Sequence, residues 1–231
     1  MAHKQQLEFV EIVRRHLPNY FDRSKVIEIG SMDINGSVRS FFKDCDYIGV
    51  DVADGRGVDL VGQGQLVEFE SGTFDVAISC ECFEHNPFWA ETFANMLRMT
   101  RPGGIVIVSC AGIGRPEHGT TRTLPSNSAG TIGLGWDYYR NISTSDLRKA
   151  AALDWWFTDY VLEAEFGHCD TMLVGVTKTE TGSQAPTLDA MRSEIRAMAN
   201  PQATIGTMAK YIAASIGGDK AISALRRIAG K

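Results

Sequence analysis

The sequence of 231 residues lacks long hydrophobic runs, and no stretch approaches the roughly 20 apolar residues that a membrane-spanning helix needs. Its first segment, MAHKQQLEFVEIVRRHL, is amphipathic and charged, and it therefore differs from a secretory signal peptide. The five cysteines are an odd number, which argues against the disulfide framework of a secreted domain. We therefore expect a cytoplasmic protein with reduced thiols and no membrane span.

The sequence also has few signs of a metal centre. Cys80 and Cys82 form a CxC pair, but no second Cys or His pair follows at zinc-finger spacing. Asp137 and Glu117 stand apart from other candidate ligands. Metal dependence is therefore not predicted, and the thiols are expected to be buried or to line a site.

A generally basic character is missing as well, because the formal net charge is -5. Phosphate binding favours a basic surface, so nucleic acid is not the expected partner. The charge is uneven, however, since from Thr181 onward the chain carries seven Lys or Arg residues against three acidic ones. This basic tail keeps a nucleic-acid anchor open as an alternative.

Short β-branched runs alternate with helical patterns along most of the chain. Strands are expected at residues 26–30, 47–52, 58–61, 74–80, 105–110, 156–166 and 170–179, and helices at residues 7–17, 36–42, 87–99 and 147–153. The alternation predicts an α/β fold with a doubly wound, seven-stranded and mostly parallel sheet that is covered on both faces. A tight turn at residues 167–169 makes one of the last two strands antiparallel, and Ser143 to Asp146 offer caps for the helix that follows.

The predicted main domain spans residues 1–180, with an N-terminal helix within residues 1–20 that Pro18 stops. Residues 111–142 show no periodicity and are rich in Gly, Ser, Thr and Pro, as expected of a substrate-binding loop. Residues 181–231 are expected to form a helical C-terminal extension, through which the chain could form a homodimer. Its helices are expected at residues 188–199, 202–216 and 220–228.

The ligand of such a sheet is expected beyond the carboxyl ends of the strands, where the strand order reverses. Gly30 and Gly36 follow the first strand, but they do not form the GxGxxG pattern of a nicotinamide dinucleotide site. Glu28 and Asp33 suit a ligand with a cationic amino group and a sulfonium better than a diphosphate, which indicates S-adenosylmethionine. Asp51 ends the second strand, where a carboxylate either binds two ribose hydroxyls or caps a turn.

Four segments resemble the class I S-adenosylmethionine-dependent methyltransferases, especially the small kind known as methyltransferase type 11. They are VIEIGSMDINGSVR, YIGVDV, FDVAISCECFEH and LRMTRPGGIVIVSC, and they stand in the family's order and spacing. The resemblance covers residues 26–179 and implies a Rossmann-like fold with S-adenosylmethionine as cofactor. The cofactor-binding residues that it implies are Glu28, Gly30, Ser31, Asp51, Val52, Gln63, Ser79, Cys80 and Glu81.

The resemblance also implies a role for each group of these residues. The first three would line the methionine end of the cofactor, while Asp51 holds the ribose and Val52 lies against the adenine. Gln63 stands where the family often has an Asp near the adenine amino group, and its amide oxygen can accept the same hydrogen bond. The segment from Ser79 to Glu81 would border the sulfonium.

The stretch Asn86-Pro87-Phe88-Trp89 is similar to the NPPY tetrapeptide of enzymes that methylate amino groups of nucleic acid bases. In those enzymes the tetrapeptide directly follows the fourth strand, whereas here it comes later and lacks the second proline. We interpret it as a helix start, with Asn86 as the cap, Pro87 in the first helical position and Phe88 or Trp89 packing inward.

The candidates for acid-base work are two histidines. His118, in a Gly-flanked loop, is the first candidate for a general base on an acceptor hydroxyl, unless it is simply an exposed loop residue. His85 belongs to a Glu-His element common in the family, and it either borders the acceptor site, acts as a base, or holds the loop. Substrate contacts are expected from five residues unless they anchor the loop on the sheet, namely Glu84, Trp136, Tyr138, Tyr139 and Arg140.

These observations predict a methyltransferase that transfers a methyl group from S-adenosylmethionine to a hydroxyl of a small molecule or a glycan. The reaction would be a direct in-line displacement, in which the protein aligns donor and acceptor and removes a proton. Two alternatives remain open, a nucleic-acid methyltransferase and a non-catalytic module that binds S-adenosylmethionine.

Overall fold

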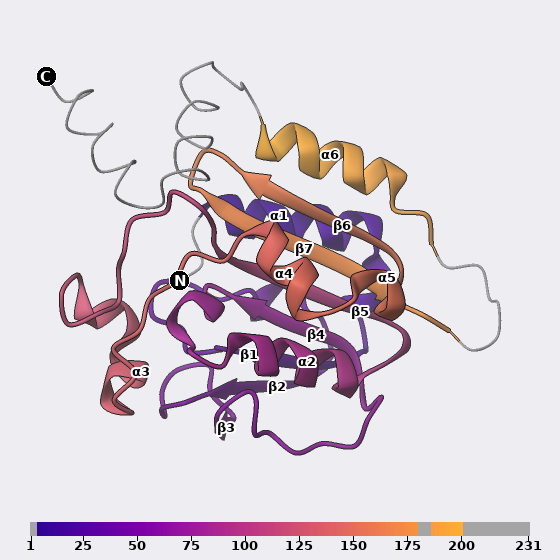
Figure 1. The fold of residues 1–231 in the computed structure, drawn as a ribbon. Helices are drawn as coiled ribbons and strands as arrows, with labels where there is room; N and C mark the ends of the chain where they lie inside the picture. Colours follow the sequence, from indigo (N-terminus) through magenta and orange to yellow (C-terminus); the bar gives the residue numbers. More distant parts are fainter. Residues whose placement is uncertain (1–3, 180–185, 201–231) are drawn as a thin grey trace, which may run out of the picture.

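The computed structural model describes residues 4–179 and 186–200 (Figure 1). A seven-stranded sheet has the order β3-β2-β1-β4-β5-β7-β6, and β7 runs antiparallel to both of its neighbours. The strands are β1 (Lys25–Ile29), β2 (Asp46–Asp51), β3 (Leu60–Val61), β4 (Phe74–Cys80), β5 (Thr100–Ala111), β6 (Phe157–Glu165) and β7 (Asp170–Thr177). The predicted Rossmann-like α/β fold, with one antiparallel strand near the edge of a mostly parallel sheet, is confirmed.

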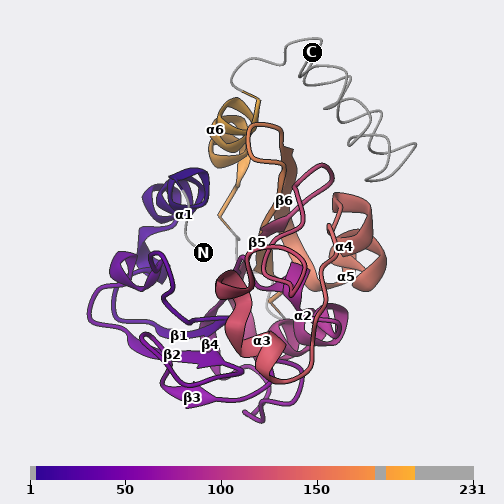
Figure 2. The same cartoon turned by 90° about the vertical axis from the view of Figure 1, so that its left-hand side faces the viewer.

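Helices cover both faces of this sheet (Figures 1 and 2). One face carries α2 (Trp89–Met99), α4 (Thr144–Ala150) and α5 (Leu153–Trp156). The other carries α1 (Lys4–His16) and α6 (Asp189–Ala199), which contact each other. Each layer encloses its own cluster of buried apolar side chains against the sheet. The central strands are therefore buried on both sides, which explains why they form continuous apolar runs in the sequence.

Local sequence signals set two of these boundaries. Helix α1 ends at His16, and the 3₁₀ helix η1 (Pro18–Tyr20) follows, because proline cannot continue the helical hydrogen bonds. At the start of α4, Ser143 Oγ accepts a hydrogen bond from Asp146 N at 3.0 Å, and the Asp146 carboxylate accepts one from Ser143 N at 2.9 Å. The predicted stop at Pro18 and the predicted caps before α4 are confirmed.

The helix expected at residues 36–42 is wrong, because this segment holds only the 3₁₀ helix η2 (Arg39–Phe41). Asp33 Oδ1 accepts a hydrogen bond from Gly36 N at 2.7 Å, and this contact turns the chain within the loop. The aromatic end of the segment then packs inward, where the rings of Phe42 and Phe21 stack with centroids 4.5 Å apart. Phe41 and Phe42 pack against the apolar cluster between α1 and the sheet, and this packing is made by the short turn in place of the expected helix.

The long loop at residues 111–142 is partly ordered into short helices. It contains η4 (Pro125–Ser128) and α3 (Ala129–Gly133), which the absence of periodicity did not predict. Figure 2 looks onto the carboxyl edge of the parallel strands, and α3 lies in front of that edge.

The chain after β7 continues the layer formed by α1. Helix α6 matches the helix expected at residues 188–199, and its buried Met191 and Ile195 belong to the apolar cluster on this face. The helices expected at residues 202–216 and 220–228, and the homodimer expected through them, fall outside the described residues. Within the described ranges, no helix is both long and apolar enough to cross a bilayer.

Candidate active site

A cleft opens at the carboxyl edge of the sheet, between the ends of β1, β2 and β4 and the η4-α3 segment. Figure 2 shows α3 in front of the ends of these strands. Counted together with its open mouth, the cleft encloses about 630 Å³. The strand order reverses between β1 and β4, so the cleft lies at the topological switch point of the sheet. The predicted site residues that line it are Gly30, Asp51, Val52, Glu81, His85 and Trp136.

The loop after β1 is held tightly between its neighbours. Gly30 N and Ser31 N both donate to Val50 O, at 2.8 and 3.1 Å. Gly30 has a φ of +84°, and a Cβ at this position would lie 2.5 Å from Cys82 Cβ. Glycine satisfies both the backbone angle and the contact, so the main chain itself forms this wall of the cleft.

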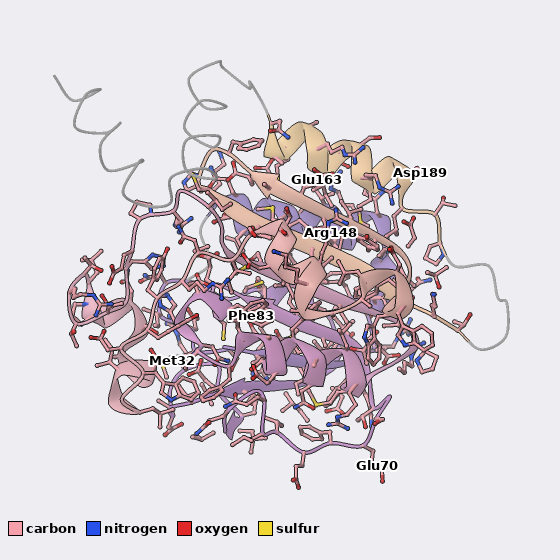
Figure 3. The ribbon with its side chains drawn as sticks, viewed as in Figure 1. Met32, Glu70, Phe83, Arg148, Glu163 and Asp189 are labelled. Atoms are coloured by element: carbon pink, nitrogen blue, oxygen red, sulfur yellow. The ribbon has the colours of Figure 1, made fainter. Side chains whose placement is uncertain are left out.

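Asp51 is positioned by backbone donors at the end of β2. Its Oδ2 accepts a hydrogen bond from Met32 N at 3.1 Å, and its Oδ1 accepts one from Ala53 N at 3.4 Å. Gly130 of α3 lies opposite, since a Cβ there would stand 3.7 Å from Asp51 Oδ1. Burial raises the pKa of Asp51, and the backbone donors act against this rise. Each carboxylate oxygen keeps a lone pair for a ligand hydroxyl. Met32, which donates the hydrogen bond to Oδ2, lies at the same edge of the sheet as α3 (Figure 3).

Five of the predicted cofactor residues do not line this cleft, namely Glu28, Ser31, Gln63, Ser79 and Cys80. Ser79 Oγ donates to Ile29 O at 2.8 Å and ties β4 to β1. Gln63 Oε1 accepts a hydrogen bond from Gln65 Nε2 at 2.8 Å, and Gly62 lines the cleft beside it. Ser79 therefore supports the cleft through the sheet, and the amide of Gln63 is engaged locally.

Glu28 lies in a small recess beneath Gly30. It is 4% exposed, and its Oε2 accepts a hydrogen bond from Tyr47 Oη at 2.7 Å. Ser31 borders the same recess, and its hydroxyl has no hydrogen-bond partner among the described residues. Burial raises the pKa of Glu28 to about 7, and the hydrogen bond from Tyr47 offsets this only in part.

Replacing Glu28 with glutamine should stabilise the ligand-free protein at high pH. Because the folded state keeps the Glu28 proton up to a pKa of about 7, wild type loses stability as the pH rises from about 4.5 to 7. Over this pH range the free energy of unfolding of wild type falls by about 3 kcal/mol, and that of the glutamine variant does not. Urea unfolding should therefore show a higher free energy of unfolding for Glu28→Gln than for wild type at pH 8 but not at pH 5.

The matched control is Glu70→Gln, because Glu70 projects from the surface (Figure 3). Its effect on the free energy of unfolding should be small at both pH values. An equal effect of Glu28→Gln at pH 5 and pH 8 would show that Glu28 titrates as an ordinary carboxyl group.

Glu81 stands at the cleft wall directly after β4. Its φ of +51° is in the left-handed region, which a non-glycine residue rarely adopts. Arg115 from the long loop forms ion pairs with Glu81 Oε2 at 3.3 Å and with Asp170 Oδ1 at 2.8 Å. The guanidinium therefore connects the cleft wall, the long loop and the start of β7.

Three buried groups converge next to Glu81. The ligand atoms of Glu84, His85 and His118 lie within 4.8 Å of one another. The two imidazole rings meet edge to face with centroids 4.9 Å apart, and the ring of Tyr139 lies 5.0 Å from that of His118. Burial lowers the pKa of His85 to about 3 and lowers that of His118, so both rings are neutral at pH 7. Burial, with Glu81 nearby, raises the pKa of Glu84 to about 8.

The predicted substrate residues of the long loop separate into two groups. Trp136 lines the cleft, and Tyr139 joins the two histidines. Tyr138 and Arg140 do not line the cleft, and Arg140 Nη2 pairs with Asp146 Oδ1 at 2.7 Å. Arg140 thus has the loop-anchoring contact that the sequence left open as an alternative.

Other parts of the long loop carry contacts that the sequence did not reveal. Asn127, Ser128 and Thr131 line the cleft but belong to no motif, so sequence reasoning missed them. Asp137 and Glu117, expected to be isolated, both pair with Arg122 at distances of 3.1 and 2.8 Å. Their role in the described structure is to hold the loop together.

The NPFW stretch stands at a helix entrance. Asn86 Oδ1 accepts a hydrogen bond from Phe88 N at 2.8 Å, and its Nδ2 donates to Thr92 Oγ1 at 2.9 Å. Helix α2 begins only at Trp89, with Phe88 in the cap position and no side-chain cap hydrogen bond, so the prediction of Asn86 as helix cap and Pro87 as the first helical residue is wrong. Asn86 instead caps the turn that precedes the helix. Both polar atoms of the amide are engaged within this segment.

Comparison with known proteins identifies a family for this chain and solved structures with a similar fold. A family model described as a methyltransferase domain matches residues 1–165. Phosphoethanolamine N-methyltransferase 2 of Haemonchus contortus is 15% identical with a TM-score of 0.54, covering 74% of this chain and 52% of its own. The 1,6-didemethyltoxoflavin N1-methyltransferase of Burkholderia thailandensis is 13% identical with a TM-score of 0.52, covering 76% of this chain and 79% of its own.

No curated protein sequence matches this chain. The two structural neighbours share its fold, and the chain spans about half the length of the Haemonchus contortus enzyme. The family model, by contrast, extends over most of the chain and contains the four motifs up to β5. The chain therefore belongs to the family of methyltransferase domains, as its motifs predicted.

Proposed function

We propose that this chain transfers a methyl group from S-adenosylmethionine to a hydroxyl of a small molecule or a glycan. The charge of the cleft is the observation that supports S-adenosylmethionine as the methyl donor. Asp51 and Glu81 line it, whereas no Lys or Arg does among the described residues. Such a cleft suits a ligand with ribose hydroxyls and a sulfonium, and it would repel a diphosphate. Both structural neighbours named above contain S-adenosylhomocysteine.

Each part of the cofactor has a matching group in this proposal. Asp51 accepts hydrogen bonds from the ribose hydroxyls, and Val52 with Gly62 borders the adenine side. The recess of Glu28 and Ser31 holds the methionine end, where a buried hydroxyl still lacks a partner in the described structure. When bound there, S-adenosylmethionine supplies an activated methyl group.

The acceptor would enter at the end of the cleft formed by Glu81, His85 and Trp136. A neutral amine can attack a methyl group before it loses a proton, whereas a hydroxyl benefits from assistance in losing its proton. The buried His85 lines this end of the cleft, and the ring centroid of the buried His118 lies 4.9 Å from that of His85, which favours a hydroxyl acceptor. In this proposal His118 would accept the proton, as the sequence predicted, through Nε2, because its Nδ1 lies 3.0 Å from Pro116 O.

The nucleic-acid alternative has less support from the described residues. Asn86 lines the cleft, but both polar atoms of its amide are engaged in hydrogen bonds at the entrance of α2. The basic tail that would anchor a nucleic acid lies outside the described residues, and the net charge of the chain is -5.

A labelled-methyl screen tests the proposed function. The full chain is incubated with methyl-labelled S-adenosylmethionine and with matched sets of hydroxyl and amine acceptors, including sugar fractions. We expect label in alkali-stable ethers of the hydroxyl set. Label confined to the amine set would contradict the hydroxyl acceptor, and label in RNA or DNA would favour the nucleic-acid alternative. Absence of label from every set, with S-adenosylhomocysteine still bound, would favour a non-catalytic module.

A further inference from the structure

We propose that Glu84, His85 and His118 form a binding site for a divalent transition-metal cation beside the cleft. The ligand atoms of these side chains lie within 4.8 Å of one another. Two imidazoles and one carboxylate form a ligand set that Zn²⁺ and Fe²⁺ use in proteins. Since such bonds are ~2.0–2.2 Å long, two ligands of one ion stand at most about 4.4 Å apart. Small side-chain shifts therefore bring all three groups onto one ion.

The strongest support is a buried carboxyl group with which no other described residue pairs. Glu84 is 0% exposed, and neither of its carboxylate oxygens has a hydrogen-bond partner among the described residues. Within the same residues, Nδ1 of the buried His85 also lacks a partner. Buried polar groups are nearly always satisfied, because an unpaired one costs free energy. A cation between these atoms would satisfy them together.

His118 is already oriented as a ligand. Its Nδ1 lies 3.0 Å from Pro116 O, and an N–H donated to that carbonyl leaves Nε2 with its lone pair. Tyr139 Oη donates to the same carbonyl at 3.0 Å, which fixes the position of this turn. Gly119 then brings the loop so close to His85 that a Cβ would lie 2.6 Å from Cε1 of the ring. The loop therefore holds the two imidazoles together.

The charges around the cluster also favour a cation. Glu81, Glu84 and Asp170 place three carboxyl groups in this region, and Arg115 pairs with the first and the last of them. Within the described ranges, no ion pair satisfies Glu84. On binding, a divalent cation would replace the proton of Glu84, which passes to solvent, and would balance the carboxylate thus formed.

Three protein ligands leave further coordination positions open, and His85 lines the cleft. If the acceptor is a hydroxyl, a cation bound to its oxygen lowers its pKa, and its proton passes to solvent. In that case the imidazoles act as ligands and not as bases. Only this consequence rests on the proposed function, since the cation site itself does not require a methyl acceptor.

Cobalt titration of the full chain tests the site directly. The protein is first freed of metal with a chelator and then titrated with Co²⁺ in the absence of cofactor and acceptor, while the visible absorption is recorded. We expect one equivalent of Co²⁺ to bind with visible bands of imidazole and carboxylate ligation, and Zn²⁺ to abolish them. Glu84→Gln and His118→Asn should each weaken binding at least about 100-fold, since loss of outer hydrogen-bond partners alone costs ~10–100-fold.

His168→Asn is the matched control, because His168 is exposed in the turn between β6 and β7 and outside the cluster. It should bind Co²⁺ as wild type does. Thermal unfolding distinguishes a folded variant that has lost the metal site from a misfolded one. Metal-free Glu84→Gln should melt at or above metal-free wild type, because glutamine removes a buried unpaired carboxyl group, and it should lose the rise in Tm that the metal gives.

The site is ruled out if wild type binds no Co²⁺, or if Glu84→Gln and His118→Asn bind it as tightly as His168→Asn. A folded Glu84→Gln variant that retains the metal-dependent rise in Tm would also rule it out. Because no cofactor or acceptor is present, failure here is distinct from a failure of methyl transfer.

Discussion

Replacing Asp51 with alanine should weaken the binding of S-adenosylhomocysteine by about two orders of magnitude. A hydrogen bond to a charged group contributes about 1.5–3 kcal/mol, and the ribose offers two hydroxyls to this carboxylate. The side chain is held in place by Met32 N and Ala53 N, so little ordering is needed when a ligand binds. Isothermal titration calorimetry on the full chain measures the change in Kd.

Two further variants make this test specific. Asp51→Asn keeps one carbonyl oxygen, which can still accept from Met32 N, and it should show an intermediate loss of affinity. Asp54→Ala alters an exposed acid three residues later and should leave the Kd unchanged. A Kd for Asp51→Ala within about twofold of wild type, a difference of ~0.4 kcal/mol, would place the ribose elsewhere.

Replacing Gly30 with alanine should destabilise the fold by about 2–6 kcal/mol. The φ of +84° is costly for a residue with a side chain, by about 1–3 kcal/mol. The new Cβ would also stand 2.5 Å from Cys82 Cβ, and relief of such overpacking costs ~1–3 kcal/mol. Chemical denaturation of both proteins measures the difference in the free energy of unfolding.

The control for this substitution lies in α3. Gly133→Ala places a Cβ where no atom stands within 4 Å and where φ is not positive, so the stability should stay the same or rise slightly. In Gly30→Ala the loops after β1 and β4 would have to shift to accept the new methyl group, and the cleft should lose affinity for S-adenosylhomocysteine as well. Equal stability of the two glycine variants would show that the two loops do not pack as tightly as described.

The strands, and the cleft residues that follow them directly, could be predicted because their sequence signals are local. Phe74–Cys80 is a β-branched run bounded by turns, and its predicted limits match β4. Gly30 and Asp51 follow strands directly, so the geometry of a parallel sheet alone brings them to one cleft. The helix expected at residues 36–42 failed because the loop contact of Asp33 and the inward packing of Phe42 outweigh local propensity.

The cluster beside the cleft was not predictable from spacing. Glu84 and His118 are 34 residues apart, and they meet because Arg115 and Gly119 fold the long loop against the end of β4. Asn127 and Thr131 likewise reach the cleft only through the short η4 and α3 helices, which have no periodic pattern. Sequence reasoning could name His85 and His118 as candidates but could not pair them with Glu84 as a ligand set.

The central claim is that the cleft at the ends of β1, β2 and β4 binds the methyl donor. A crystal structure of the full chain with S-adenosylhomocysteine measures this most directly. We predict both ribose hydroxyls within hydrogen-bond distance of the Asp51 carboxylate, and the sulfur atom facing Glu81 and Cys82. Ligand bound outside this cleft, or no ligand density at saturating concentration, would contradict the account.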